Sequence, residues 1–119
     1  MTTPIFQTEV VGKILVVQLD HKIGSFADVD ISQATKTVGN KITANSLTGI
    51  VIDFTGVAYF GSGILEAIRV IWNHLPEQTG RMVLCNLEPV ALEIIQIANF
   101  NTLWPIFETR EAALASLGE

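Results

Sequence analysis

Residues 49–54 constrain the fold most, because they form a short apolar run (Gly-Ile-Val-Ile-Asp-Phe) without polar alternation. Such a run is typical of a strand that is covered on both faces, as in a parallel or mixed sheet. Apolar residues then recur at intervals of four, three and four between Ile64 and Leu75. This spacing predicts an amphipathic helix over residues 62–75, which Pro76 closes. We therefore expect a central strand that leads through a loop into a helix.

The chain before this strand predicts a hairpin and a further helix. Two short segments rich in β-branched residues, 5–11 and 14–19, are separated by Gly12-Lys13, which indicates two strands and a turn. Apolar residues at helical intervals predict a helix over residues 30–44, and Asp30 and Gln33 are spaced as a capping box at its start. The hairpin would supply an antiparallel part of the sheet.

The chain after the central helix continues the alternation of strands and helices. The expected elements are a strand at 82–85, a helix from 89 to about 98, a strand at 104–107 and a helix at 110–117. Pro89 fits the first turn of a helix, Asn99 can take the left-handed conformation beyond its end, and Thr109 can cap the last helix. The pattern predicts an α/β fold in which a small mixed sheet carries helices packed mainly on one face.

Size and charge limit what the chain can be. Its 119 residues, 49% of them hydrophobic, are typical of one compact domain, which we expect to span 1–119. The formal net charge of −5 disfavours nucleic acid as a partner, and the apolar stretches are too short to span a membrane. Cys85 is the one cysteine, so no disulfide can form within the chain, and no cleavable leader opens it. We expect a cytoplasmic protein.

The densest chemical signal is the glycine-rich segment 53–65, which runs from the central strand into the helix. Ligands of open α/β sheets gather outside the carboxyl ends of strands, and a helix start attracts anions. Ser62 stands at this start between Gly61 and Gly63, so its hydroxyl would be open to another protein. A phosphate on it would meet the positive end of the helix dipole, which makes Ser62 a candidate switch residue. The alternative is that Ser62 simply caps the helix, since serine is a preferred N-cap.

Patterns for nucleophilic catalysis are missing. Glycines do not lie two residues from Ser62 on either side, as a nucleophile elbow requires. A base for Ser62 would have to be His21 or His74, and both are interpreted more simply as surface residues. The chain also lacks the glycine-rich motifs that cradle phosphates. We therefore expect no enzyme activity and no cofactor.

Metal-binding patterns are missing as well. The acids Asp20, Asp28 and Asp30 do not have the spacing of a calcium loop, and one cysteine with two scattered histidines does not make a zinc site. Cys85 ends a strand and is expected to be a small core residue rather than a nucleophile. Trp72 and Trp104 are expected in the core or at its rim.

The order of these elements resembles the STAS domain family over nearly the whole chain. The resemblance rests on the strand end at Asp53-Phe54, the loop that reaches Ser62, and the tail Phe-Glu-Thr-Arg-Glu-Ala-Ala-Leu at 107–114. The family comprises anti-sigma factor antagonists, stressosome subunits and cytoplasmic domains of some anion transporters. It implies a bacterial regulatory module that acts by protein–protein interaction in signal transduction and transcription regulation.

The resemblance also implies a phosphorylation site. In phosphorylatable antagonists the loop reads Asp-Ser-Ser/Thr-Gly-Leu, and the second hydroxyl residue accepts phosphate. In a gapless alignment from Asp53, Gly61 falls on the Asp, Ser62 on the first Ser and Gly63 on the acceptor. The family's Leu-Asp pair after the second strand is replaced by Ile-Gly at 23–24, although Asp20 lies close by. Ser62 becomes the phosphorylation candidate if the register shifts by one residue.

Two functions follow from this resemblance. In the first, the chain binds an anti-sigma factor that is a serine protein kinase and thereby releases a sigma factor. The residues expected to contact this partner are Tyr59, Phe60, Gly61, Ser62, Gly63 and Ile64. In the second, the chain is a non-phosphorylated scaffold, or senses a small anion or nucleotide, within a stressosome-like or transporter-associated complex. The sequence leaves the oligomeric state and the identity of the partner open.

Overall fold

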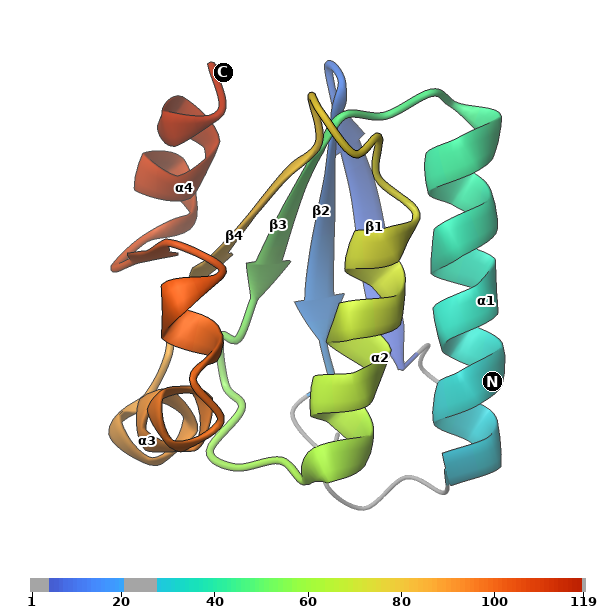
Figure 1. The fold of residues 1–119 in the computed structure, drawn as a ribbon. Coiled ribbons are helices and arrows are strands. Elements are labelled where there is room, and N and C mark those ends of the chain that lie inside the picture. Colours follow the sequence, from blue (N-terminus) through green and yellow to red (C-terminus); the bar gives the residue numbers. More distant parts are fainter. Residues whose placement is uncertain (1–4, 21–27, 119) are drawn as a thin grey trace.

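The computed structural model describes residues 5–20 and 28–118, which form a five-stranded sheet, four α-helices and a short 3₁₀ helix (Figure 1). The strands are β1 (Phe6–Val11), β2 (Ile14–Leu19), β3 (Gly49–Asp53), β4 (Arg81–Cys85) and β5 (Ile106–Phe107). The helices are α1 (Asp28–Ala44), α2 (Ser62–Asn73), α3 (Pro89–Ile97), the 3₁₀ helix η2 (Phe100–Thr102) and α4 (Arg110–Ser116).

The sheet is mixed, as the sequence predicts. Its order is β1-β2-β3-β4-β5, so β3 is the central strand. β1 and β2 form the antiparallel hairpin, in which Val11 pairs with Ile14 across the turn at Gly12-Lys13. β2, β3, β4 and β5 pair in parallel. The carboxyl ends of these four strands therefore meet at one edge of the sheet, which lies at the bottom of Figure 1.

Helices cover both faces of β3 but in unequal numbers. α1 and α2 lie on one face and α4 on the other (Figure 1). Ile50 and Ile52 belong to the larger core cluster, which also takes in residues of α1, α2 and α3, whereas Val51 belongs to a smaller cluster with Ala113 of α4. The alternation explains why the strand is apolar throughout, and it confirms a sheet with its helices mainly on one face.

Two expected boundaries are wrong. α1 begins at Asp28, so Asp30 and Gln33 lie inside the helix and do not form the capping box at its start. The Asp-x-x-Gln spacing is local, and it fits the first turns of a helix as well as its cap. The last strand, expected over 104–107, is limited to two residues, because Trp104 is buried in an aromatic cluster with Trp72 (ring centroids 5.6 Å apart) and Phe100 (4.8 Å) instead of pairing in the sheet.

Other local predictions are confirmed. Pro89 is in the first turn of α3, and Asn99 has a φ of 63° beyond the end of that helix. Thr109 caps α4, because its side-chain oxygen accepts a hydrogen bond from the Ala112 amide at 3.1 Å. Within residues 5–20 and 28–118, no helix has the length and apolar character needed to cross a membrane.

Candidate functional site

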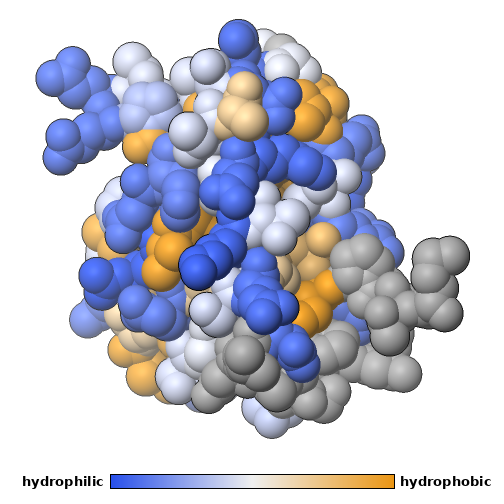
Figure 2. Space-filling model, turned by 90° about the vertical axis from the view of Figure 1, so that its right-hand side faces the viewer, coloured by the Kyte–Doolittle hydropathy of each residue, from blue (hydrophilic) through white to orange (hydrophobic). Residues whose placement is uncertain are grey.

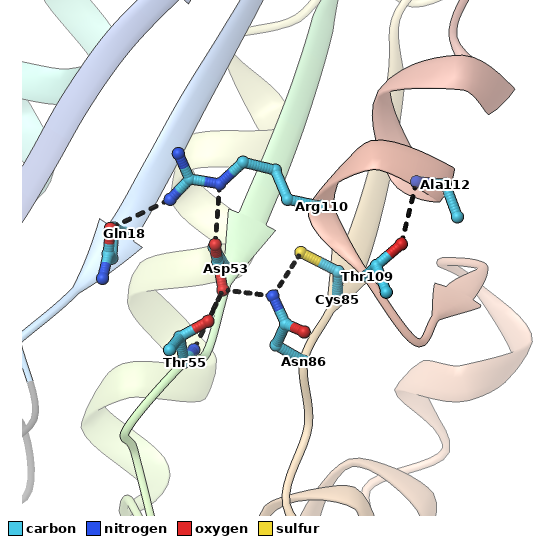
Figure 3. A network of polar contacts seen from close by, with 8 residues as sticks. All are labelled: Gln18, Asp53, Thr55, Cys85, Asn86, Thr109, Arg110 and Ala112. Atoms are coloured by element: carbon cyan, nitrogen blue, oxygen red, sulfur yellow. Dashed lines mark hydrogen bonds and ion pairs between the residues drawn. The ribbon is translucent and has the colours of Figure 1, made fainter.

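Asp53, the last residue of β3, is the centre of a polar network at the carboxyl edge of the sheet (Figure 3). Its side chain is only 3% exposed. One carboxylate oxygen, Oδ1, accepts hydrogen bonds from the Thr55 amide (2.9 Å), the Thr55 hydroxyl (2.6 Å) and the Asn86 amide group (3.0 Å). The other, Oδ2, accepts from Nε of Arg110 at 2.8 Å. This buried charge therefore has both a cation and several neutral donors around it.

The network joins elements that are distant in the sequence. Arg110, the first residue of α4, also donates from Nη2 to the side-chain oxygen of Gln18 on β2 at 2.9 Å. Asn86 follows β4 directly and takes a left-handed conformation with a φ of 59°. Asp53 thus connects β2, β4 and α4 to the central strand (Figure 3). A buried, fully hydrogen-bonded carboxylate of this kind holds structure together and is not free to act on a ligand.

Two groups here have shifted pKa values. Burial alone would raise the pKa of Asp53, but the hydrogen bonds from Thr55, Asn86 and Arg110 outweigh it and hold the pKa below its ordinary value of 3.8. Burial is also the main reason that the pKa of the neighbouring Cys85 thiol is raised to about 12, and the nearby Asp53 charge adds to the effect. Cys85 is therefore a protonated core residue, as the sequence predicts, and not a reactive thiol.

The loop from β3 to α2 alternates between buried and exposed side chains. It turns at Gly56, whose φ is 80°, and the Val57 amide donates to the Phe54 carbonyl at 2.9 Å. Val57 and Phe60 are buried, and the rings of Phe54 and Phe60 lie 5.3 Å apart. Val57 and Phe60 therefore hold the loop against the core, and the residues between them face solvent.

The start of α2 differs from the sequence expectation in its cap. Gly61 is the N-cap residue, with extended backbone (φ −102°, ψ −174°), and it provides no side-chain hydrogen bond. Ser62 is the first helical residue, and its side chain is exposed. The alternative in which Ser62 caps the helix is therefore wrong. A serine hydroxyl reaches the amides of the first turn only from the position before the helix, which the glycine occupies.

The six residues expected to contact a partner differ in exposure, and Gly63 is intermediate between the buried and the exposed ones. Phe60 and Ile64 are each only 2% exposed and belong to the core, so their side chains offer no surface to another protein. Both residues instead pack in the core and hold the loop and the helix in place, and a partner contact at these two positions stays a prediction. Tyr59 is 61% exposed, and Gly61 and Ser62 are also exposed.

A groove begins beside Ser62 and runs between α1 and α2, with a volume of about 640 Å³. Its lining residues are Ile31, Ser32, Thr35, Lys36, Ser62, Gly63, Glu66, Ala67 and Val70. The floor is apolar and the rim carries one cation and one acid, Lys36 and Glu66. Figure 2 shows that hydrophilic side chains cover most of the face on which α1 lies, with hydrophobic side chains in small separate patches.

The remaining candidate residues do not join this site. His74 follows α2 at the end opposite to Ser62, and its Nδ1 lies 2.9 Å from the Val70 carbonyl, so it cannot act as a base for Ser62. His21 and residues 23–24 lie outside the described residues. Among the side chains that the structure does place, no group of three or more His, Cys, Asp or Glu is arranged to hold a metal ion.

Sequence reasoning missed the partners of Asp53. Gln18 and Asn86 belong to no motif, and Arg110 enters only as part of the tail at 107–114. Their meeting depends on strand register and on where α4 docks. One signal was available, since polar residues at the ends of neighbouring parallel strands meet at the same edge of a sheet.

Comparisons with known proteins agree with this architecture. A Bordetella bronchiseptica protein, BtrV, which carries the name of an anti-sigma factor antagonist, is 31% identical over 67 residues, or 56% of this chain and 58% of that protein. The chain thus matches little more than half the length of this relative. An anti-sigma factor antagonist (STAS) domain protein from Planctomyces limnophilus has a similar structure, with a TM-score of 0.81 and 22% identity over 96% of this chain and 98% of that one.

SpoIIAA shares the fold in two states. Its structure as an unphosphorylated anti-sigma factor antagonist gives a TM-score of 0.78 with 20% identity over 94% of this chain and 95% of that one. The phosphorylated form of the Bacillus protein gives 0.71 with 20% identity over 94% and 98%. The model of the STAS domain matches residues 6–113. The chain belongs to the STAS domain family, and within it resembles the anti-sigma factor antagonists.

Proposed function

We propose that this chain is a cytoplasmic, single-domain regulator that binds an anti-sigma factor of the serine kinase type and thereby releases a sigma factor. The observation that carries the proposal is the exposed start of α2, where Tyr59, Gly61 and Ser62 face solvent above buried anchors. A docking surface requires exposed side chains that are free to contact a partner and buried residues that hold them in a fixed position. The names of BtrV and of the solved relatives support the class of partner.

The groove between α1 and α2 extends this surface. Ser62 and Gly63 lie at its start, and Lys36 lines it from α1. A segment of the partner that enters the groove would meet an apolar floor and one residue of each charge at the rim. Docking there buries the Ser62 hydroxyl, so a group added to this hydroxyl would act directly on binding.

Phosphorylation of Ser62 is the switch that we propose for this surface. Within the described residues, the Ser62 hydroxyl makes no hydrogen bond, so a kinase would meet no competing contact. The phosphate would be tolerated by the helix start but would place negative charge in a desolvated interface, which lowers affinity. The switch therefore favours dissociation of the partner.

A second candidate function rests on Gly63. This glycine occupies the family's usual acceptor position, so a chain that is never phosphorylated is also consistent with the sequence. In that case the protein would be a scaffold, or would sense a small anion or nucleotide at the groove, inside a larger complex. Substitution of Ser62 would then have no effect unless it distorted the loop.

The test is a binding titration with the serine-kinase anti-sigma factors of the same organism, each produced separately, using isothermal titration calorimetry. We expect one of them to bind, Ser62→Asp to weaken that binding at least about tenfold, and Ser62→Ala to leave it nearly unchanged. Thr79→Asp is the matched control, because it adds the same charge at the opposite edge of the sheet, beside Arg81. No binding by any candidate would refute the antagonist function. Equal binding by Ser62→Asp and Ser62→Ala would refute the switch.

A further inference from the structure

Helix α3 carries an apolar stripe that the fold does not cover. Ala91 and Ile95 face the core and are fully buried. Val90 and Ile97, in contrast, are 53% and 76% exposed, and Ile94 between them is partly buried. Positions 90, 94 and 97 have the spacing of one helix face, so these three side chains form a continuous stripe (the α3 stripe) beside the buried one.

This stripe is unusual for the surface of the chain. The other large exposed apolar side chains among the described residues are Val10 on β1, Tyr59 in the loop before α2, and Leu103 just after η2. Of the helices in the described part of the chain, only α3 exposes two large aliphatic side chains on one face. Exposed apolar groups arranged at helical spacing are the usual mark of a surface that binds another helix.

The charge around the α3 stripe indicates what could cover it. The whole segment from Met82 to Thr109 contains no Lys or Arg, but it contains Glu88, Glu93 and Glu108. Glu88 is the N-cap residue of α3, and Glu93 is exposed on the helix itself. The next cation along the chain, Arg110, is already paired with Asp53. An occupant with basic residues beside an apolar face would therefore meet the acids of α3 and no Lys or Arg from the segment 82–109.

We propose that α3 is a second docking surface, which binds a basic amphipathic helix of another protein through Val90, Ile94 and Ile97. The partner would pack its apolar face along this stripe and place Lys or Arg near Glu88 and Glu93. α3 and the start of α2 lie at the same end of the sheet, but they are separate segments of the chain, and the loop from β3 to α2 runs between them in Figure 1. The inference goes beyond the proposed antagonist function, and a chain could use both surfaces in one assembly.

Two other occupants fit less well. A second copy of this chain would bring Glu88 and Glu93 against the same residues of its partner, and like charges at an interface oppose association. A membrane surface with anionic lipids would be repelled by the same acids and by the net charge of −5. Both remain outcomes that the experiment distinguishes.

The test uses the full chain and two short synthetic peptides. One has leucine and lysine arranged as an amphipathic helix, and the other has glutamate in place of lysine. We expect the lysine peptide alone to bind, with amide chemical shifts of residues 90–98 changing in nuclear magnetic resonance spectra. The double variant Val90→Gln/Ile97→Gln should bind it at least about tenfold more weakly, whereas Val10→Gln, which removes an exposed valine from β1, should bind as the parent does.

Further measurements separate the alternatives. Glu93→Gln should weaken binding several-fold and reduce its dependence on salt, because the attraction is electrostatic at the rim. The proposal is refuted if the glutamate peptide binds equally well, or if Val90→Gln/Ile97→Gln binds as tightly as the parent. It is also refuted if the parent chain forms a dimer that this double variant abolishes. Binding of the parent chain to phosphatidylglycerol vesicles in a flotation assay, if the double variant abolishes it, would refute the proposal as well. Circular dichroism should show all three variants folded, since the altered side chains are exposed.

Discussion

Asp53 and Ser62 lie at the same edge of the sheet, one at each end of a single loop, yet their surroundings are opposite. The Asp53 carboxylate is buried and accepts four hydrogen bonds from three residues. The Ser62 hydroxyl is exposed, and the helix that it begins has no side-chain cap. A polar group that is already satisfied within the fold stabilises it, whereas one that is left free is available to a partner. The difference separates the structural residues of this edge from those that we propose to be functional.

The largest expected effect comes from removing the satisfied group. Asp53→Ala leaves Arg110, Asn86 and Thr55 without their acceptor, and it should lower the free energy of unfolding by about 3 kcal/mol. Chemical denaturation measures this loss. Arg110→Ala should cost less, about 1 to 2 kcal/mol, because the arginine is partly exposed and Asp53 keeps its other donors.

Glu77→Ala is the control for the loss of a carboxylate at an exposed position, and it should change stability by less than about 0.5 kcal/mol. If Asp53→Ala were as mild as this control, the network would be incidental to folding. Asp53 and Ser62 would then differ in how exposed they are, but not in what they contribute to stability.

A smaller effect is expected from pH. Because the pKa of Asp53 is lower in the folded chain than its ordinary value of 3.8, the unfolded chain binds the proton more readily as the pH falls through that value. The stability that Asp53 contributes is therefore complete above about pH 5 and is lost as the pH falls below 3.8 toward the folded pKa. The effect is smaller than that of Asp53→Ala, because a protonated carboxyl group still accepts hydrogen bonds.

Comparison with Asp53→Asn isolates this contribution from that of the other acids. The difference in free energy of unfolding between parent and variant should be constant from pH 7 to about pH 5 and shrink at lower pH. A difference that stayed constant down to pH 3 would mean that the hydrogen bonds to the carboxylate only cancel the effect of its burial on the pKa. Urea denaturation at each pH provides the measurement.

These two regions also differ in how far the sequence predicts them. The strands and helices around them follow from apolar periodicity, which is a local property, so β3 and α2 are found with small errors at their ends. The position of Ser62 at the start of α2 is likewise local. The two candidates for the N-cap, Gly61 and Ser62, differ by one position in the sequence. The preference of serine for that position predicts Ser62, whereas the N-cap residue is Gly61.

The Asp53 network is not local, and the sequence does not predict it. Gln18, Asn86 and Arg110 meet only because the parallel register aligns Gln18 with Asp53 and because α4 docks on that face. The burial of Phe60 has the same origin. An aromatic residue in a glycine-rich loop can either contact a partner or pack in the core. Only the packing of Phe60 against Phe54 distinguishes these two roles.

The smallest expected effect comes from giving the start of α2 the cap that it lacks. Gly61 has the extended backbone of an N-cap residue, and a Cβ placed there would meet no atom within 4 Å. Gly61→Asp should therefore let a carboxylate accept from the free amides of the first turn and raise the free energy of unfolding by about 0.5 kcal/mol, while Gly61→Ala should lower it slightly. If both variants had equal stability, water would already satisfy those amides as well as a side chain can. A gain in stability together with weaker partner binding would instead mean that the start of α2 is left uncapped for the sake of binding, because the same amides cannot serve a fixed cap and an incoming ligand at once.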